Sequence, residues 1–128
     1  MSLDVAVVGS PFADLVFAGL PRLPQAGQEI VGTAFRMVPG GSAMQAIGLA
    51  RLGVAVALVS PRGNDAGGRA IADVLADEGV AWVGPDADAT PTTAVLIAPE
   101  GTAMATATAT AEPAVEDVAG TGASLVVL

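Results

Sequence analysis

The sequence lacks four residue types altogether: Cys, His, Lys and Tyr. Without Cys there is no disulfide framework, thiolate zinc site or cysteine nucleophile. Without His there is no Ser-His-Asp triad and no imidazole metal ligand or proton shuttle. Without Lys there is no Schiff base and no Walker-type lysine. Any chemistry must therefore use carboxylates, hydroxyls, Arg and backbone N–H groups.

Positive charge and aromatic side chains are also scarce. Five cationic residues, all Arg, stand against thirteen Asp and Glu, so the net charge is −8, and aromatic residues make up 3%. Such a chain is a poor candidate for electrostatic binding of nucleic acid. No apolar run reaches the about 18 residues that span a bilayer, and the start MSLDVAVVGS has no basic leader region. We therefore expect a cytoplasmic protein with no nucleic-acid or membrane partner.

What is present predicts one α/β domain over residues 1–128. Hydrophobic residues make up 52% of the chain, enough for a packed core. Two helices are expected, one over 42–52 with Ser42 as N-cap and one within 63–79 with Asp65 as N-cap. Short buried strands are expected at 3–8, 54–59, 80–83 and 124–128. This alternation predicts a Rossmann-like parallel sheet flanked by helices.

The remaining segments predict a smaller β structure. Residues 10–29 carry three prolines and are expected to form a loop, followed by a strand over 30–38 that ends at Pro39. Residues 92–98 and 103–110 predict a hairpin with a four-residue turn, and the Ala-Thr alternation of its second arm places threonines on one face. A short helix is expected over 112–118.

The final run, SLVVL, has two interpretations. It is either a peripheral last strand or a central strand of an α/β protein cut off in the middle of its sheet. Since a central parallel strand needs a neighbour on each side and nothing follows this one, the pattern favours the second interpretation.

Two features are candidates for a binding site. Asp14 is expected just past the first strand, where α/β sheets bind ligands, and its carboxylate could accept two hydrogen bonds from vicinal hydroxyls. Gly40 and Gly41 precede a helix, so close backbone approach and free N–H groups would suit a hydroxyl-rich ligand. The alternatives are a solvated loop Asp and a simple turn. The segment after the first strand is not GxGxxG, which disfavours a dinucleotide site.

Four segments, taken in order, resemble the N-terminal part of a PfkB-family, ribokinase-like carbohydrate kinase. They are VVGSPFADLVF, LPQAGQEIVGTAFRMVPGGSAMQAIGLARLG, GNDAGGRAI and TPTTAVLIAPEGTAM. The second contains the di-glycine signature and a helix that ends in ARLG. Together the segments cover nearly the whole chain, and the ordered set is more specific than any one of them.

The resemblance implies a kinase that transfers the ATP γ-phosphate to a sugar or nucleoside hydroxyl. Asp14 matches the aspartate that holds substrate hydroxyls, Gly40 and Gly41 match the di-glycine beside the sugar, and Gln45 stands where the family usually has Asn. Strands near 28–38 and 92–110 would form a β-lid over the substrate and could pair two copies into a homodimer. ATP and Mg²⁺ are implied for the full-length parent only.

The family's nucleotide site and catalytic aspartate, in a GAGD signature, have no counterpart here. The segment 117–123, DVAGTGA, ends in Ala123 instead of Asp and precedes an expected strand, so we interpret it as an ordinary loop. We therefore expect no catalytic residue and no metal site on this chain, and no activity from it alone. The alternatives are a non-catalytic sugar-binding or regulatory module and a truncated reading frame.

Overall fold

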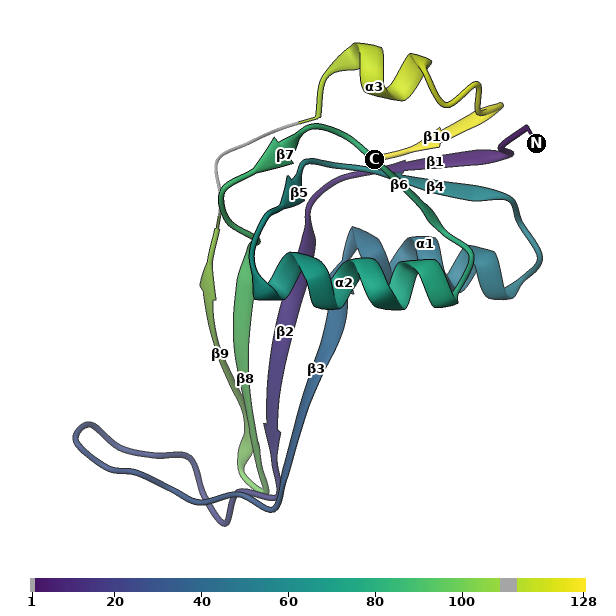
Figure 1. Cartoon of the computed structure of the whole chain (residues 1–128). Helices are drawn as coiled ribbons and strands as arrows, with labels where there is room; N and C mark the ends of the chain where they lie inside the picture. The colour runs from purple at the N-terminus through teal and green to yellow at the C-terminus, as the bar shows by residue number, and fades with distance from the viewer. Residues whose placement is uncertain (1, 109–112) are drawn as a thin grey trace.

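The computed structural model describes residues 2–108 and 113–128, which form two four-stranded sheets that meet at an angle (Figure 1). The first sheet is entirely parallel and has the order β10-β1-β4-β6. Its strands are β10 (Leu125–Val127), β1 (Val5–Val8), β4 (Val56–Val59) and β6 (Ala81–Val83). Both central strands are short runs of Val, Ala and Leu, as expected for parallel strands with both faces covered.

Two helices cover one face of this sheet, while the short helix α3 (Val115–Ala119) lies on the other side (Figure 1). The two are α1 (Ser42–Arg51) and α2 (Ala66–Asp77). Leu58 of β4 is fully buried in one hydrophobic cluster with Ile71 and Leu75 of α2, each 1% exposed. Burial of each such side chain contributes about 1.5–3 kcal/mol, so this layer holds the body together.

The second sheet, called the lid sheet below, projects away from the helices (Figure 1). Its order is β3-β2-β8-β9, with β2 (Pro11–Ala18) between β3 (Ala34–Gly41) and β8 (Thr92–Ala98), and β9 (Gly101–Ala107) at the far edge. β2 is antiparallel to β3 and parallel to β8. A two-stranded ladder of β5 (Arg62–Gly63) and β7 (Asp86–Ala87) completes the described chain. The expected fold class, a helix-flanked parallel sheet with a small β-lid, is confirmed.

The loop expected over 10–29 is wrong in its first half, because β2 forms there. Pro11 is the first residue of the strand, where a missing N–H costs little, and the other two prolines lie beyond Ala18. Asp14 is consequently inside a strand rather than in a loop after one. The bounds of β3 are also shifted: the strand runs through Pro39, which its position at the sheet edge allows.

Ser42 is not the N-cap of α1. Gly41 occupies that position, and the Ser42 hydroxyl donates instead to the carbonyl of Gly9 at 2.8 Å. The N-cap expected for α2 is confirmed, since the Asp65 carboxylate accepts from the N–H of Gly68 at 2.8 Å. In both helices a glycine with positive φ directly follows the C-cap residue, as expected: Gly53 after Leu52 and Gly79 after Glu78.

The hairpin at the lid edge is tighter than expected. Ala98 pairs with Gly101, so Pro99 and Glu100 form a two-residue turn. The expected residues 109 and 110 of its second arm, and residue 112 of the expected short helix, lie outside the described residues. β10 lies at the end of its sheet in the described chain, paired with β1. No helix among the described residues has the length and apolarity to cross a membrane.

Candidate functional site

Asp14 lies near the middle of the lid sheet, on the face opposite to Ala13 and Leu15. In the strand register it is opposite Val38 of β3 on one side and Thr93 of β8 on the other. Its carboxylate helps to line a hollow of about 250 Å³, together with Phe12, Gly41, Thr93, Val95, Met104 and Thr106. The hollow therefore combines one carboxylate and two hydroxyls with an apolar wall.

Gly40 lets the Asp14 carboxylate lie directly over the backbone of β3. A Cβ at Gly40 would be 2.1 Å from Oδ2 of Asp14, far inside contact distance. Gly41 is required for a second reason: its φ is +59°, and a Cβ there would meet the Phe12 ring and the Ser10 carbonyl, both at 2.6 Å. Thus the two glycines shape the hollow from the β3 side.

The N-terminus of α1 begins directly after these glycines. No described side chain caps its first turn, although the Ser42 N–H donates to the Ser10 carbonyl at 3.2 Å. The following N–H groups have no partner within the helix, and the helix dipole makes this end partly positive. Polar oxygens of a ligand beside Gly41 would find donors there.

Burial raises the pKa of the Asp14 carboxyl above its ordinary value, and the hydroxyl of Thr93 opposes this by a smaller amount. Removing water from a carboxylate disfavours its charged form unless hydrogen-bond donors replace the water. Thr93 is 7% exposed, and its hydroxyl is also 3.1 Å from that of Thr106. A ligand that brings hydroxyl donors to Asp14 would relieve this desolvation.

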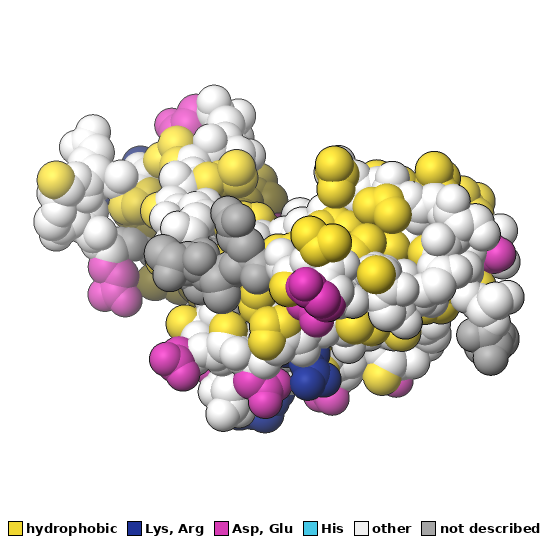
Figure 2. Space-filling view, turned by 90° about the horizontal axis from the view of Figure 1, so that it is seen from above, with side chains coloured by type: hydrophobic (Ala, Val, Ile, Leu, Met, Phe, Trp, Pro, Cys, Tyr) yellow, Lys and Arg dark blue, Asp and Glu magenta, His cyan; other side chains and the backbone are white. Residues whose placement is uncertain are grey.

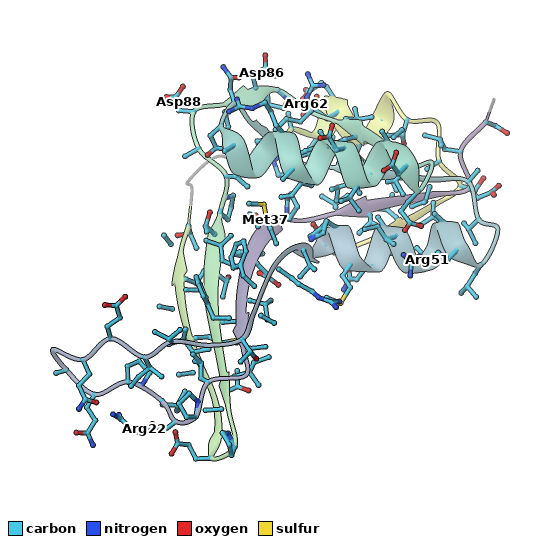
Figure 3. All side chains as sticks on the ribbon, turned by 60° about the horizontal axis from the view of Figure 1, so that its bottom comes forward. Arg22, Met37, Arg51, Arg62, Asp86 and Asp88 are labelled. Atoms are coloured by element: carbon cyan, nitrogen blue, oxygen red, sulfur yellow. The ribbon has the colours of Figure 1, made fainter. Side chains whose placement is uncertain are left out.

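The arginines of the chain lie elsewhere, so within the described residues no cation lines the hollow. Figure 3 shows Arg22 on the loop between β2 and β3, while Arg62 and Asp86 lie together beside α2. Arg62 pairs with Asp86 at 3.2 Å, and Arg51 of α1 pairs with Glu78 after α2, with Nε 3.0 Å from Oε2. Across residues 2–108 and 113–128, no three His, Cys, Asp or Glu side chains gather closely enough to hold a metal ion.

The structure brings three of the four expected site residues together. Asp14 and Gly41 line the hollow and Gly40 lies directly beside the Asp14 carboxylate, whereas Gln45 is exposed on α1 and is not part of the lining. Sequence reasoning missed Thr93 and the apolar wall. The signal for Thr93 was its position in a strand opposite Asp14, which could not be recognised while β2 was expected to be a loop.

Comparison with known proteins shows which family the sequence matches. The model of the pfkB family carbohydrate kinases matches residues 2–123. A ribokinase of Bacillus subtilis (strain 168) is 44% identical over 78 residues, which cover 60% of this chain and 26% of the relative. The ribokinase of Haemophilus influenzae is 35% identical over 81 residues, 62% of this chain and 26% of that relative.

The fold has solved counterparts as well. The ribokinase of Arabidopsis thaliana, solved with ribose and ATP, superposes with a TM-score of 0.68 at 28% identity, covering 84% of this chain and 36% of that one. The chain thus spans about a quarter of the length of its curated relatives and about a third of this solved structure. Since the family match extends over nearly all of the chain, the protein belongs to the pfkB family of carbohydrate kinases.

Proposed function

We propose that this chain provides the sugar-binding part of a ribokinase-like kinase. In this function the Asp14 carboxylate accepts hydrogen bonds from vicinal hydroxyls of a sugar or nucleoside. Gly40 and Gly41 let the sugar ring approach the backbone, and Thr93 and Thr106 add hydroxyl partners. The observation that carries the proposal is that Asp14 and Gly41 line one hollow, with Gly40 directly beside the Asp14 carboxylate.

The environment of Asp14 suits binding rather than proton transfer by this chain alone. A charge-assisted hydrogen bond is roughly twice as strong as a neutral one, so a partly buried carboxylate discriminates for hydroxyl donors. The lid sheet would shield the sugar from water, which strengthens each polar contact. Gln45 would touch only a substrate that extends past Gly41 onto α1.

For the whole kinase we propose transfer of the ATP γ-phosphate to a hydroxyl of the bound sugar or nucleoside, with Mg²⁺ as cofactor. The residues described here do not fit ATP or Mg²⁺: the chain has no Lys, its net charge is −8, and no acidic cluster of the kind that holds a metal is present in the described part. The segment 117–123, expected to be an ordinary loop, begins within α3 and precedes β10, and its Asp117 accepts from the Ala114 N–H at 3.0 Å.

A non-catalytic sugar-binding module is the second candidate. The same hollow supports it, and the poor fit of the described residues to ATP favours it over independent catalysis. The two differ in whether sugar binding is followed by turnover of ATP. Both functions suit a protein of the cytoplasm, where sugars and nucleotides meet.

Binding of sugar to the chain tests the proposal directly. We expect D-ribose or a related pentose or nucleoside to shift the backbone amide resonances of Asp14, Gly41 and Thr93 in an NMR titration. Gly40→Ala is expected to abolish these shifts, because its methyl group would displace the Asp14 carboxylate. Its backbone strain is small, since Gly40 does not have positive φ.

Gly48→Ala is the matched control. Gly48 is exposed in α1, and a Cβ there meets nothing within 4 Å. The change should stabilise the helix by about 0.5–1 kcal/mol and leave sugar binding unaltered. Equal sugar binding by the wild type and Gly40→Ala would show that the hollow is not the binding site. If no pentose, hexose or nucleoside bound, the proposed function would be contradicted.

A further inference from the structure

Asp65 makes more contacts than a helix cap requires. Its Oδ1 accepts from the Gly68 N–H at 2.8 Å, which caps α2, and also from the Thr90 hydroxyl at 2.5 Å. Its Oδ2 accepts from the Thr90 N–H at 2.8 Å. A helix cap needs only one acceptor oxygen, which Oδ1 supplies to Gly68. The other two hydrogen bonds of the carboxylate are both made to Thr90.

Two glycines make room for this arrangement. A Cβ at Gly63 would be 1.9 Å from the Thr90 hydroxyl oxygen, and a Cβ at Gly68 would be 1.8 Å from the Gly63 carbonyl oxygen. The segment Gly63-Asn64-Asp65 therefore closes tightly around Thr90, which is 7% exposed. These contacts account for the spacing of Gly63, Asp65 and Gly68 in the segment GNDAGGRAI.

Thr90 is the point at which the chain enters the lid sheet. Pro91 follows it, and the Pro91 carbonyl accepts from the Ala13 N–H of β2 at 2.8 Å. The Thr92 hydroxyl donates to the Thr90 carbonyl at 3.1 Å, and β8 then places Thr93 opposite Asp14. A continuous set of contacts thus runs from the Asp65 carboxylate to the strand that flanks Asp14.

The electrostatics agree with this geometry. The Thr90 hydroxyl is the largest of the influences that hold the pKa of Asp65 below its ordinary value, with further lowering from the Gly68 and Thr90 N–H groups and from Arg69. The carboxylate is therefore charged at neutral pH and makes charge-assisted hydrogen bonds. Thr90 would leave a buried N–H unpaired if this acceptor were lost.

We propose that Asp65 is a positioning residue: by holding Thr90, it holds the start of β8 and so sets Thr93 against Asp14 in the sugar site. The consequence for sugar binding rests on the proposed function above, while the anchoring of β8 does not. Asp65 itself touches no substrate on this proposal.

Asp65→Asn separates the two contacts of the carboxylate. The Asn oxygen can still accept from Gly68, and Asn is as good an N-cap as Asp, so α2 should keep its end. The Asn amide would face the Thr90 N–H with a second donor. We expect amide hydrogen exchange in residues 92–96 to accelerate about tenfold or more, with exchange in residues 70–75 of α2 changed far less.

Three further variants serve as comparisons in this test. Thr90→Val removes only the hydroxyl donor and should accelerate exchange in the same strand to a smaller extent, whereas Thr90→Ser keeps the donor and should restore protection. Asp77→Asn, an exposed change at the other end of α2, should have no effect. The fluorescence of Trp82, the single Trp of a chain without Tyr, reports the global stability of each variant.

A second readout follows Asp14 itself. Because the Thr93 hydroxyl lowers the Asp14 pKa, displacement of β8 in Asp65→Asn should raise that pKa further in a carbon-13 NMR titration. Unchanged exchange in residues 92–96, exchange that rises equally in α2 and β8, or an unaltered Asp14 pKa would overturn the proposal. Failure of the wild type to bind sugar would count against the proposed function alone, since neither readout needs a ligand.

Discussion

At the scale of single residues, Asp14 shows a conflict between stability and binding. Its pKa is raised by burial, so the folded state holds the proton more tightly than the unfolded chain does. The stability from this group is therefore complete below the ordinary value of 3.8 and is lost as the pH rises through the higher folded pKa. At neutral pH the charged Asp14 destabilises the ligand-free fold.

Asp14→Asn should therefore leave the ligand-free chain as stable as the wild type or more so at pH 7, while it weakens sugar binding. Replacing a charge-assisted contact with a neutral one removes roughly 1.5–3 kcal/mol, so affinity should fall about 10- to 150-fold, as should kcat/KM in a full-length enzyme. Urea unfolding followed by Trp82 fluorescence and calorimetric sugar titration measure the two effects. Clear destabilisation at pH 7, or unchanged affinity, would show that Asp14 is a structural residue.

At the scale of secondary-structure elements, the sequence is sufficient for the body and weaker for the lid sheet. α2 could be predicted with its cap because Asp65, the apolar stripe of Ile71 and Leu75, and Gly79 all agree. β1 and β4 could be predicted because both of their faces are covered, so their residues are apolar without interruption. Each of these signals is local, and no distant partner is needed to read them.

β2 could not be predicted on the same basis. Its first residue, Pro11, indicates a loop, and its residues are partly buried on both faces, so no regular alternation marks the strand. β3 and β8 pair with its two edges. Those partners lie downstream, so the strand is defined by pairing rather than by its own pattern. For the same reason Thr93 was not predicted as a site residue, because its position opposite Asp14 depends on the register between β2 and β8.

The lid sheet leaves part of one face apolar and exposed in the described chain, beyond Ala13, which is buried beside Gly67 of α2. Opposite the Asp14 face, Phe17, Phe35 and Met37 are 38%, 57% and 39% exposed, and the two Phe rings lie 5.2 Å apart. In keeping with the homodimer expected through the lid strands, we propose that a second copy covers this face. Figure 2 shows a different apolar region over α3 and β10, where Val115 is 80% exposed.

Phe35→Asp should then convert a dimer to a monomer in light scattering coupled to size-exclusion chromatography, because burying the new charge is costly. Val115→Asp, which alters the other region, should leave the dimer intact. Both residues are exposed, so circular dichroism should show both variants folded. Loss of association in Val115→Asp alone would place the contact at α3 instead.

At the scale of the whole molecule, the surface is large for the mass. The exposed area is 7,384 Å², compared with about 6,200 Å² for a compact protein of 12.5 kDa. The projecting lid sheet accounts for the shape (Figure 1). A sugar at the Asp14 hollow would lie on this sheet rather than deep in the body.

We predict that the chain alone does not catalyse phosphoryl transfer, since its net charge of −8 works against holding a polyanionic nucleotide. Phosphoryl transfer needs groups that stabilise the γ-phosphate and a positioned proton acceptor, and the hollow has no cation among its lining residues. We expect no sugar-dependent release of ADP from the purified chain, with the ribokinase of Bacillus subtilis as a positive control in the same assay. ADP release that requires sugar and follows the monomer fraction would contradict this expectation.

The position of β2 between two partners also affects how the protein is made. Its partner β3 begins at Ala34, soon after β2 ends, but Thr92 of β8 follows its register partner Ala13 by 79 residues. At a synthesis rate of about 5–20 residues per second, one edge of β2 would wait roughly 4–16 s for its neighbour. During that time the nascent hairpin carries an unpaired edge with Leu15 and Phe17 on it, which is the kind of surface that chaperones bind and that aggregation begins from. The strand that carries Asp14 thus depends on protection at the ribosome until β8 has been made.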